Sequence, residues 1–180
     1  MELRETADLI IKAAIRSALP DEAVRRALAQ WEPKGRVCLV AIGKAAWQMA
    51  NAAYALLEDK ISQGIVITKH GYSMGAIGAL RIREAGHPVP DADSYSATQE
   101  ALEMVQGLTA SDTVLFLVSG GGSALFESPL IAQSELEEIT SRLLGCGADI
   151  TEMNIIRKRL SNVKGGRFAL HCAPAQVLSV

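Results

Sequence analysis

Residues 113–126 read TVLFLVSGGGSALF, and this stretch decides the fold of the chain. The run Thr113–Val118 consists of β-branched and large apolar side chains, which is typical of a strand buried on both faces of a parallel sheet. Residues 119–123 contain three consecutive glycines, which free the backbone for positive φ angles and close approach. Residues 124–126 predict the first turn of a helix. Because this order points N–H groups at an anion, we predict a phosphate or carboxylate site, with a tight turn inside the core as the alternative.

The composition of the 180 residues favours a layered α/β domain. Hydrophobic residues make up 49% of the chain but aromatic residues only 4%, so the core must be built from aliphatic side chains and alanine. The net charge of −2 lacks the basic excess of a nucleic-acid binder, and no apolar run reaches the roughly 18 residues needed to span a bilayer. We therefore expect neither nucleic acid nor a membrane as a partner.

Cysteine usage and the N-terminus predict a cytoplasmic protein. The three cysteines are far apart, form no CxxC pair and are odd in number, which argues against a disulfide framework and against a structural zinc site. The N-terminal residues MELRETAD contain early acids and no apolar core region, so we expect no signal peptide. A reducing cytoplasm is the expected location.

The remaining segments alternate between strand and helix patterns. Short apolar runs predict strands at 37–42, 64–68, 80–84 and 176–180. Apolar residues at helical spacing, with breakers and caps at the ends, predict helices near 3–18, 20–28, 45–57, 91–105, 134–145 and 150–163. Ser134 with Glu137, and Asp149 with Glu152, match the capping box that begins a helix. This alternation predicts a mostly parallel sheet covered by helices.

A lysine stands at the start of the helix predicted after residues 37–42. Gly43 ends the strand and Lys44 follows, where its charge opposes the helix dipole. A bound phosphate or carboxylate would compensate this charge, and the alternative is a surface lysine that points into water. The segment is not a P-loop, because Cys38 stands where the motif needs glycine and Ala45 where it needs Ser or Thr.

His87 lies in a proline-rich segment, AGHPVP, at residues 85–90. As a hinge histidine it could touch a substrate. We favour the alternative, a local hydrogen bond, because that is the commoner role of such a residue.

Residues 151–168 reverse the charge of this acidic chain, with five basic residues against Glu152. A solvated helix with a basic last turn explains part of the pattern, because the helix dipole favours cations there. The four residues 164–167 place two cations around two glycines, which resembles an anion clamp.

Four segments in this order resemble the N-terminal domain of the class II glycerate 2-kinases, the MOFRL-type family, some of whose members were labelled hydroxypyruvate reductases. They are IGKAAWQMA at 42–50, EAGHPVPD at 84–91, LFLVSGGGSAL at 115–125 and EMNIIRKRLSNVKGGRFA at 152–169. The resemblance implies a Rossmann-like, three-layer α/β domain, and it implies Lys44 as the candidate for phosphoryl-transfer chemistry. It further implies substrate or phosphate contacts at Ser119, Gly120, Gly121, Gly122, Ser123, Asn154, Arg157, Lys158, Lys164, Gly165 and Gly166.

The resemblance implies ATP-dependent phosphorylation of D-glycerate to 2-phosphoglycerate, with Mg²⁺ as the divalent cation. The cations of Lys44, Arg157 and Lys164 and the N–H groups of the glycine loops suit the neutralisation of phosphoryl oxygens. No carboxylates in the sequence form a convincing Mg²⁺ site, so we predict no metal ligand.

The predicted strand at 176–180 ends the chain, whereas proteins of this family are much longer. We expect residues 1–180 to be a partial N-terminal domain, truncated at its C-terminus, with the remainder and the C-terminal domain absent. On this expectation the chain does not phosphorylate glycerate alone. Exposed sheet edge favours self-association or association with a missing C-terminal half.

Two other functions remain open at the level of the sequence. A non-catalytic α/β module that binds anions would use the same loops. A hydroxypyruvate reductase would need a dinucleotide site, and the chain contains no GxGxxG fingerprint.

Overall fold

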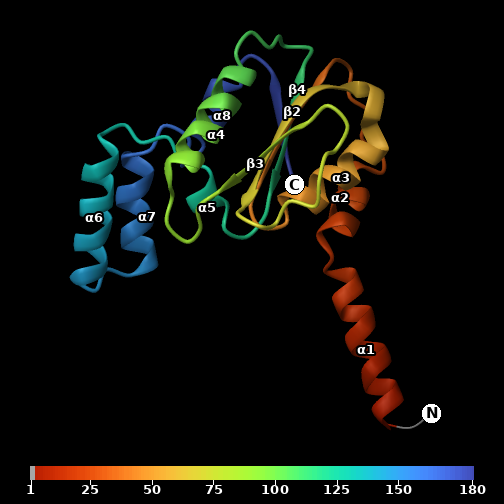
Figure 1. Cartoon of the computed structure of the whole chain (residues 1–180). Coiled ribbons are helices and arrows are strands. Elements are labelled where there is room, and N and C mark those ends of the chain that lie inside the picture. The colour runs from red at the N-terminus through yellow and green to blue at the C-terminus, as the bar shows by residue number, and fades with distance from the viewer. Residues whose placement is uncertain (1–2) are drawn as a thin grey trace.

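The computed structural model describes residues 3–180, in which helices cover both faces of a central sheet (Figure 1). The sheet has five parallel strands in the order β3-β2-β1-β4-β5. They are β1 (Val37–Ile42), β2 (Ile61–Lys69), β3 (Arg81–Ala85), β4 (Thr113–Val118) and β5 (Gln176–Ser179). The helices are α1 (Leu3–Ser17), α2 (Pro20–Leu28), α3 (Ala46–Leu57), η1 (Glu58–Lys60), α4 (Ala92–Met104), α5 (Gly122–Leu125), α6 (Gln133–Gly145), α7 (Ile150–Arg159) and α8 (Arg167–His171). The predicted α/β class and parallel sheet are confirmed.

Strand β1 shows how the sequence builds a sheet with a core on each face. All six of its residues are buried, as the continuous apolar run predicted. Its even-numbered side chains join the apolar cluster formed with α4, α5 and α8. Its odd-numbered side chains join the cluster formed with α2 and α3. The sheet is therefore the middle of three layers.

Several boundaries differ from the prediction for local reasons. Strand β2 begins at Ile61 rather than Gly64, because Ile61 still pairs with Val37 across a bulge. Helix α7 ends at Arg159 rather than at residue 163, because Ser161 leaves the helix to form an antiparallel bridge with Pro129. Helix α8 was not predicted. We expected no signal peptide from the N-terminal residues MELRETAD, and the first two of these lie outside the described residues.

One of the two capping boxes predicted from the sequence is present in the structure. The predicted cap of α7 is confirmed, because Asp149 accepts hydrogen bonds from the N–H groups of Thr151 and Glu152. The box predicted for Ser134 and Glu137 is wrong. Helix α6 begins at Gln133, and the carboxylate that reaches back belongs to Glu135, which accepts a bond from the N–H of Ala132.

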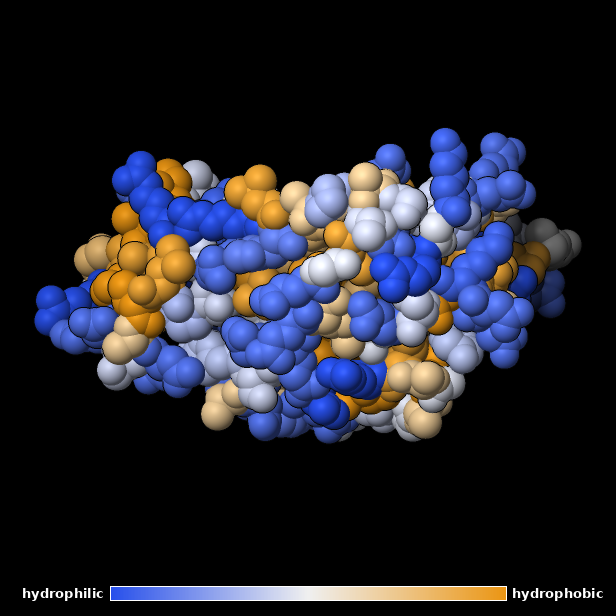
Figure 2. Space-filling model, turned by 90° about the horizontal axis from the view of Figure 1, so that it is seen from above, coloured by the Kyte–Doolittle hydropathy of each residue, from blue (hydrophilic) through white to orange (hydrophobic). Residues whose placement is uncertain are grey.

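Two parts of the molecule lie outside the layered body. Helix α1 projects from it and, like α7, buries none of its residues. Helices α6 and α7 lie side by side at the opposite end (Figure 1), and apolar side chains gather at the same end of the face in Figure 2. The apolar stripe predicted on 150–163 belongs only in part to the core: Ile150 is exposed, whereas Val163 is buried in the cluster formed with α4, α5 and α8. The three stripe residues between them are half-buried. No helix between residues 3 and 180 combines the length and hydropathy needed to cross a membrane.

Asp112 ties together the amino ends of the central strands. Its side chain, which is 3% exposed, accepts two hydrogen bonds from the guanidinium of Arg36, the residue before β1. It also accepts bonds from the N–H and the hydroxyl of Thr109. The Arg36 bond is the largest cause that lowers the pKa of Asp112 below its ordinary value.

We predict that Asp112→Asn lowers the stability of the fold at neutral pH and that this difference disappears in acid. Because the pKa of Asp112 is lower in the folded state, its contribution is fully present above the unfolded pKa of about 3.9 and is lost as pH falls toward the folded pKa. Urea denaturation of both proteins between pH 7 and pH 2 measures the difference. A difference that stays constant over this range contradicts the assignment.

Candidate functional site

The candidate site lies where the strand order reverses. From β1 the chain passes to β2 and β3 on one side, whereas β4 and β5 lie on the other. Ligands of open α/β sheets bind outside the carboxyl ends of the strands at such a point. The loops after β1 and β4 carry Lys44 and the three consecutive glycines, respectively. The two predicted anion-binding segments therefore meet.

Hydrogen bonds join these two loops directly. The N–H of Lys44 donates to the carbonyl of Gly120 over 2.9 Å. The hydroxyl of Ser119 accepts a bond from the N–H of Ala45 at 3.0 Å and donates to the carbonyl of Ile42 at 3.1 Å. Ser119, predicted as a ligand contact, thus uses its hydroxyl within the framework.

Gly43 makes this close approach possible. A Cβ atom at residue 43 would lie 2.2 Å from the Oγ of Ser119 and 2.5 Å from its carbonyl oxygen. The backbone at Gly43 also has a φ of +114°, which L side chains rarely adopt. Both constraints require glycine at this position.

A cavity of about 560 Å³ opens beside the glycine loop. Its floor is apolar and includes Phe116, Phe126 and Phe168, whose ring centroids lie between 4.9 and 5.9 Å apart. Its lining contains most of the predicted contact residues, namely Ser119, Gly121, Gly122, Ser123, Asn154, Lys158, Lys164, Gly165 and Gly166. An apolar floor strengthens the interaction of a ligand with the polar groups around it.

Backbone N–H groups in the two glycine loops have no acceptor within residues 3–180. They belong to Gly120 and Gly121 after β4, and to Gly165 and Gly166 between α7 and α8. Free N–H groups of this kind form anion-binding concavities. The helix after the first loop supplies less than predicted, because α5 has only four residues and hence a small dipole.

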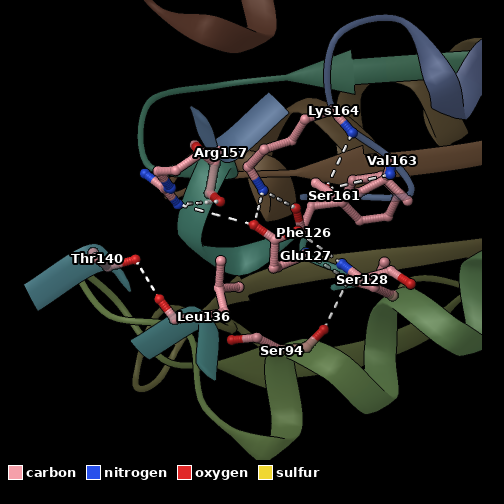
Figure 3. A network of polar contacts seen from close by, with 12 residues as sticks. Ser94, Phe126, Glu127, Ser128, Leu136, Thr140, Arg157, Ser161, Val163 and Lys164 are labelled. Carbon is pink, nitrogen blue, oxygen red and sulfur yellow. Dashed lines mark hydrogen bonds and ion pairs between the residues drawn. The ribbon is translucent and has the colours of Figure 1, made fainter. Parts of the chain in front are cut away.

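Glu127 lies at the centre of a buried polar network with Arg157 and Lys164 (Figure 3). Its side chain is 1% exposed and accepts a hydrogen bond from the ammonium of Lys164, which also donates to the carbonyl of Phe126 at 3.0 Å. Burial lowers the pKa of Lys164, and the attraction of Glu127 opposes that effect. The cation predicted as part of an anion clamp is therefore already paired with a carboxylate.

Helix α7 contributes two cations in different environments. Arg157 points inward, where a guanidinium nitrogen lies 3.4 Å from the carbonyl oxygen of Ser123 and 4.0 Å from a carboxylate oxygen of Glu127. Lys158 is exposed and lines the cavity. Arg157 thus supports the glycine loop from behind, whereas Lys158 is available to a ligand.

His87 belongs to this site, although we favoured a local role for it from the sequence. A Cβ built on Gly121 would lie 2.9 Å from Cδ2 of His87, 3.0 Å from Nε2 and 3.3 Å from Cε of Lys44. The imidazole and the lysine therefore converge on the same glycine. Burial, with the charges of Lys44 and Lys69, lowers the pKa of His87. The placement of His87 after β3, at the same edge of the sheet, was the available signal.

Within residues 3–180, the lining of the cavity includes no carboxylate, so it does not fit a Mg²⁺ ion and we derive no step through one. The described residues contain one cluster with metal-ligand chemistry, formed by His70, Asp91 and Asp93. Its central carboxylate caps α4 and accepts from His70 at 2.9 Å. The positive end of the helix dipole disfavours a cation there.

Comparisons with known proteins agree with this fold. The family model described as “Domain of unknown function (DUF4147)” matches residues 6–180. The D-glycerate 2-kinase of Thermotoga maritima is 50% identical over 183 aligned residues, which cover 99% of this chain and 43% of that protein. A protein of Agrobacterium vitis with the provisional name hydroxypyruvate reductase is 40% identical over 98% of this chain and 40% of its own length.

A solved structure gives the same result. The crystal structure of a glycerate kinase from Thermotoga maritima, at 50% identity, matches 98% of this chain and 43% of that chain with a TM-score of 0.90. The chain spans about two fifths of the length of these relatives.

We predict that Gly43→Ala destabilises the protein through the contact with Ser119, beyond the effect of its φ angle. Gly71→Ala is the matched control, because Gly71 has a φ of +76° but nothing within 4 Å of a built Cβ. The control should lose about 1–2 kcal/mol from its φ angle alone. A clash with backbone should make the loss at Gly43 clearly larger. Equal losses in chemical denaturation would contradict the close approach.

We predict that Lys164→Met lowers the free energy of unfolding by about 3–5 kcal/mol, because it leaves the buried carboxylate of Glu127 without its closest cation. The double variant with Glu127→Gln should recover much of this loss. Lys158→Met removes an exposed cation from the same cavity and should have little effect. Chemical denaturation measures all three, and an unchanged midpoint for Lys164→Met would refute the role of the pair.

Proposed function

Because the chain belongs to the DUF4147 family, we propose that it supplies the first part of a kinase that transfers the γ-phosphoryl group of ATP to the 2-hydroxyl group of D-glycerate. The kinase names of similar proteins from Thermotoga maritima support this activity. The class II, MOFRL-type assignment and a cytoplasmic location are parts of the proposal. Since the chain spans about two fifths of those relatives, the remaining part is the expected partner in the complete site.

The observation that carries the proposal is the meeting of two glycine loops at one cavity. Gly121, Gly165 and Gly166, whose N–H groups have no acceptor within residues 3–180, line the cavity beside its apolar floor together with Lys158. The side chain of Lys44 approaches the same glycine loop at Gly121. Phosphoryl transfer consists mainly of positioning and of neutralising charge on the phosphoryl oxygens. Donors that are fixed before the ligand arrives do this without reorganisation.

Each loop has a distinct role in the proposed reaction. Lys44 neutralises the transferring phosphoryl group, and the N–H groups of Gly120 and Gly121 bind its oxygens. Lys158 and the loop at Gly165 hold further phosphate oxygens at the far side of the cavity. These roles follow the charges and free donors of the site.

The two other functions make different predictions. A binding module would take up the anion without turnover. A reductase, the activity suggested by the provisional name of the Agrobacterium vitis protein, would oxidise NADH or NADPH with hydroxypyruvate, which the loss of absorbance at the nicotinamide band measures. The missing dinucleotide fingerprint speaks against the reductase.

We predict that Lys44→Ala weakens the binding of D-glycerate and of a non-hydrolysable ATP analogue by about tenfold in one or both cases, which corresponds to about 1.4 kcal/mol. Lys34→Ala is the matched control, because Lys34 is an exposed lysine before the opposite end of the same strand. Isothermal titration calorimetry measures both affinities. Unchanged affinities in Lys44→Ala, or equal losses in the control, would argue against a ligand at this site.

A coupled assay for ADP separates the kinase from the binding module. In any form of the protein that turns over, Lys44→Ala should lower kcat beyond its effect on affinity, because charge on the transferring group grows in the transition state. A variant that loses only affinity would favour the module.

A further inference from the structure

We propose that His87 receives the hydroxyl group of the substrate and accepts its proton during phosphoryl transfer. The inference rests on the proposed function and deepens it, because it assigns the residue that recognises the attacking oxygen. It begins from the convergence of His87 and Lys44 on Gly121.

The geometry brings together the two groups that such a reaction needs at one oxygen atom. The phosphoryl group is transferred to the hydroxyl oxygen, so the cation on the phosphoryl group and the acceptor of the hydroxyl proton must be neighbours. Nε2 of His87 and Cε of Lys44 lie 3.0 and 3.3 Å from the same point above Gly121. Only glycine leaves this point empty, because any Cβ there would contact both side chains.

His87 also has a ring nitrogen that is free to accept a hydrogen bond, as this role requires. Within residues 3–180, no other residue forms a hydrogen bond with the ring of His87. One of the two nitrogens of a neutral imidazole is a hydrogen-bond acceptor. The ring is half-buried and open to a small ligand at the edge of the sheet.

Burial and nearby positive charges favour the neutral form of the His87 imidazole. Burial lowers the pKa of His87, and the charges of Lys44 after β1 and Lys69 at the end of β2 lower it further. On the side of α4, the carboxylate of Asp91 is paired with His70 and accepts a bond from the N–H of Ser94. A neutral imidazole at physiological pH is the form that accepts a proton.

The hydroxyl oxygen forms a bond to the γ-phosphorus of ATP. The bond from that phosphorus to the β,γ-bridging oxygen breaks, and its electron pair leaves with ADP. The hydroxyl proton moves to the free nitrogen of His87 and then to water.

A comparison of two ligands, on the unaltered chain and on variants, tests the contact with the hydroxyl group. 3-Hydroxypropionate has the carboxylate and the 3-hydroxyl of D-glycerate but lacks the 2-hydroxyl. Calorimetric titration of the chain should give an affinity for D-glycerate about three- to tenfold higher, as expected for one hydrogen bond. His87→Ala should remove this preference and leave the affinity for 3-hydroxypropionate unchanged, whereas His171→Ala should leave both unchanged.

The outcomes separate the two proposals. If D-glycerate binds and His87→Ala retains the preference, the role of His87 is wrong and the proposed function stands. If D-glycerate does not bind to the unaltered chain, the proposed function fails and the inference fails with it. His87→Asn, which is polar and smaller, guards against misfolding: it should also lose the preference while keeping the unaltered thermal midpoint.

A second measurement tests the coupling between Lys44 and the imidazole. The chain contains three histidines, so nitrogen-detected NMR can follow each ring separately. Lys44→Ala should raise the pKa of His87 and leave that of His171 unchanged. An unchanged pKa of His87 would show that the two side chains are not neighbours and would overturn the proposal.

Discussion

The site depends on the approach of two backbone loops that no side chain separates. Neighbouring strands lie about 4.7–4.9 Å apart, and a side chain at residue 43 would collide with the loop after β4. Gly43 has no side chain there, and the hydroxyl of Ser119 occupies the space. This hydroxyl accepts a bond from the N–H of Ala45 and donates one to the carbonyl of Ile42. The bond from Lys44 to the carbonyl of Gly120 then fixes the lysine relative to the glycine loop. The relative position of cation and free N–H groups is thus set by the framework.

A buried carboxylate inside a site for anions has a physical explanation. A free carboxylate there would repel the ligand, but Glu127 is covered and paired with Lys164. The pair connects the end of α5 with the loop that precedes α8, and Arg157 extends it to the carbonyl of Ser123. A buried pair of this kind contributes little net stability, whereas loss of either partner is costly. Its consequence is therefore geometric: it holds the second glycine loop against the first.

Much of the fold could be predicted because its strands are continuous apolar runs. Residues 37–42 and 113–118 pack on both faces of the sheet, and such strands leave a signal in a short stretch of sequence. The convergence of Lys44 with the three glycines also followed, because carboxyl ends of parallel strands share one edge. The pairing of Lys164 could not be predicted, since its partner lies 37 residues away and in a different element. Helix α7 shows a similar limit, because it buries none of its residues completely and helical periodicity does not reveal how far another element covers a face.

The histidine illustrates why local patterns underestimate a site. In the sequence His87 lies in a proline-rich segment, where a local hydrogen bond is the commoner role of a histidine. In the fold it meets a lysine from 43 residues earlier at a glycine from 34 residues later. Each of these three residues follows its own strand, so the conformational entropy of arranging them is lost during folding rather than when a ligand binds. A site assembled from the ends of β1, β3 and β4 therefore exists before its ligand arrives, which is the condition under which neutral N–H groups and one uncharged imidazole can orient a small anion.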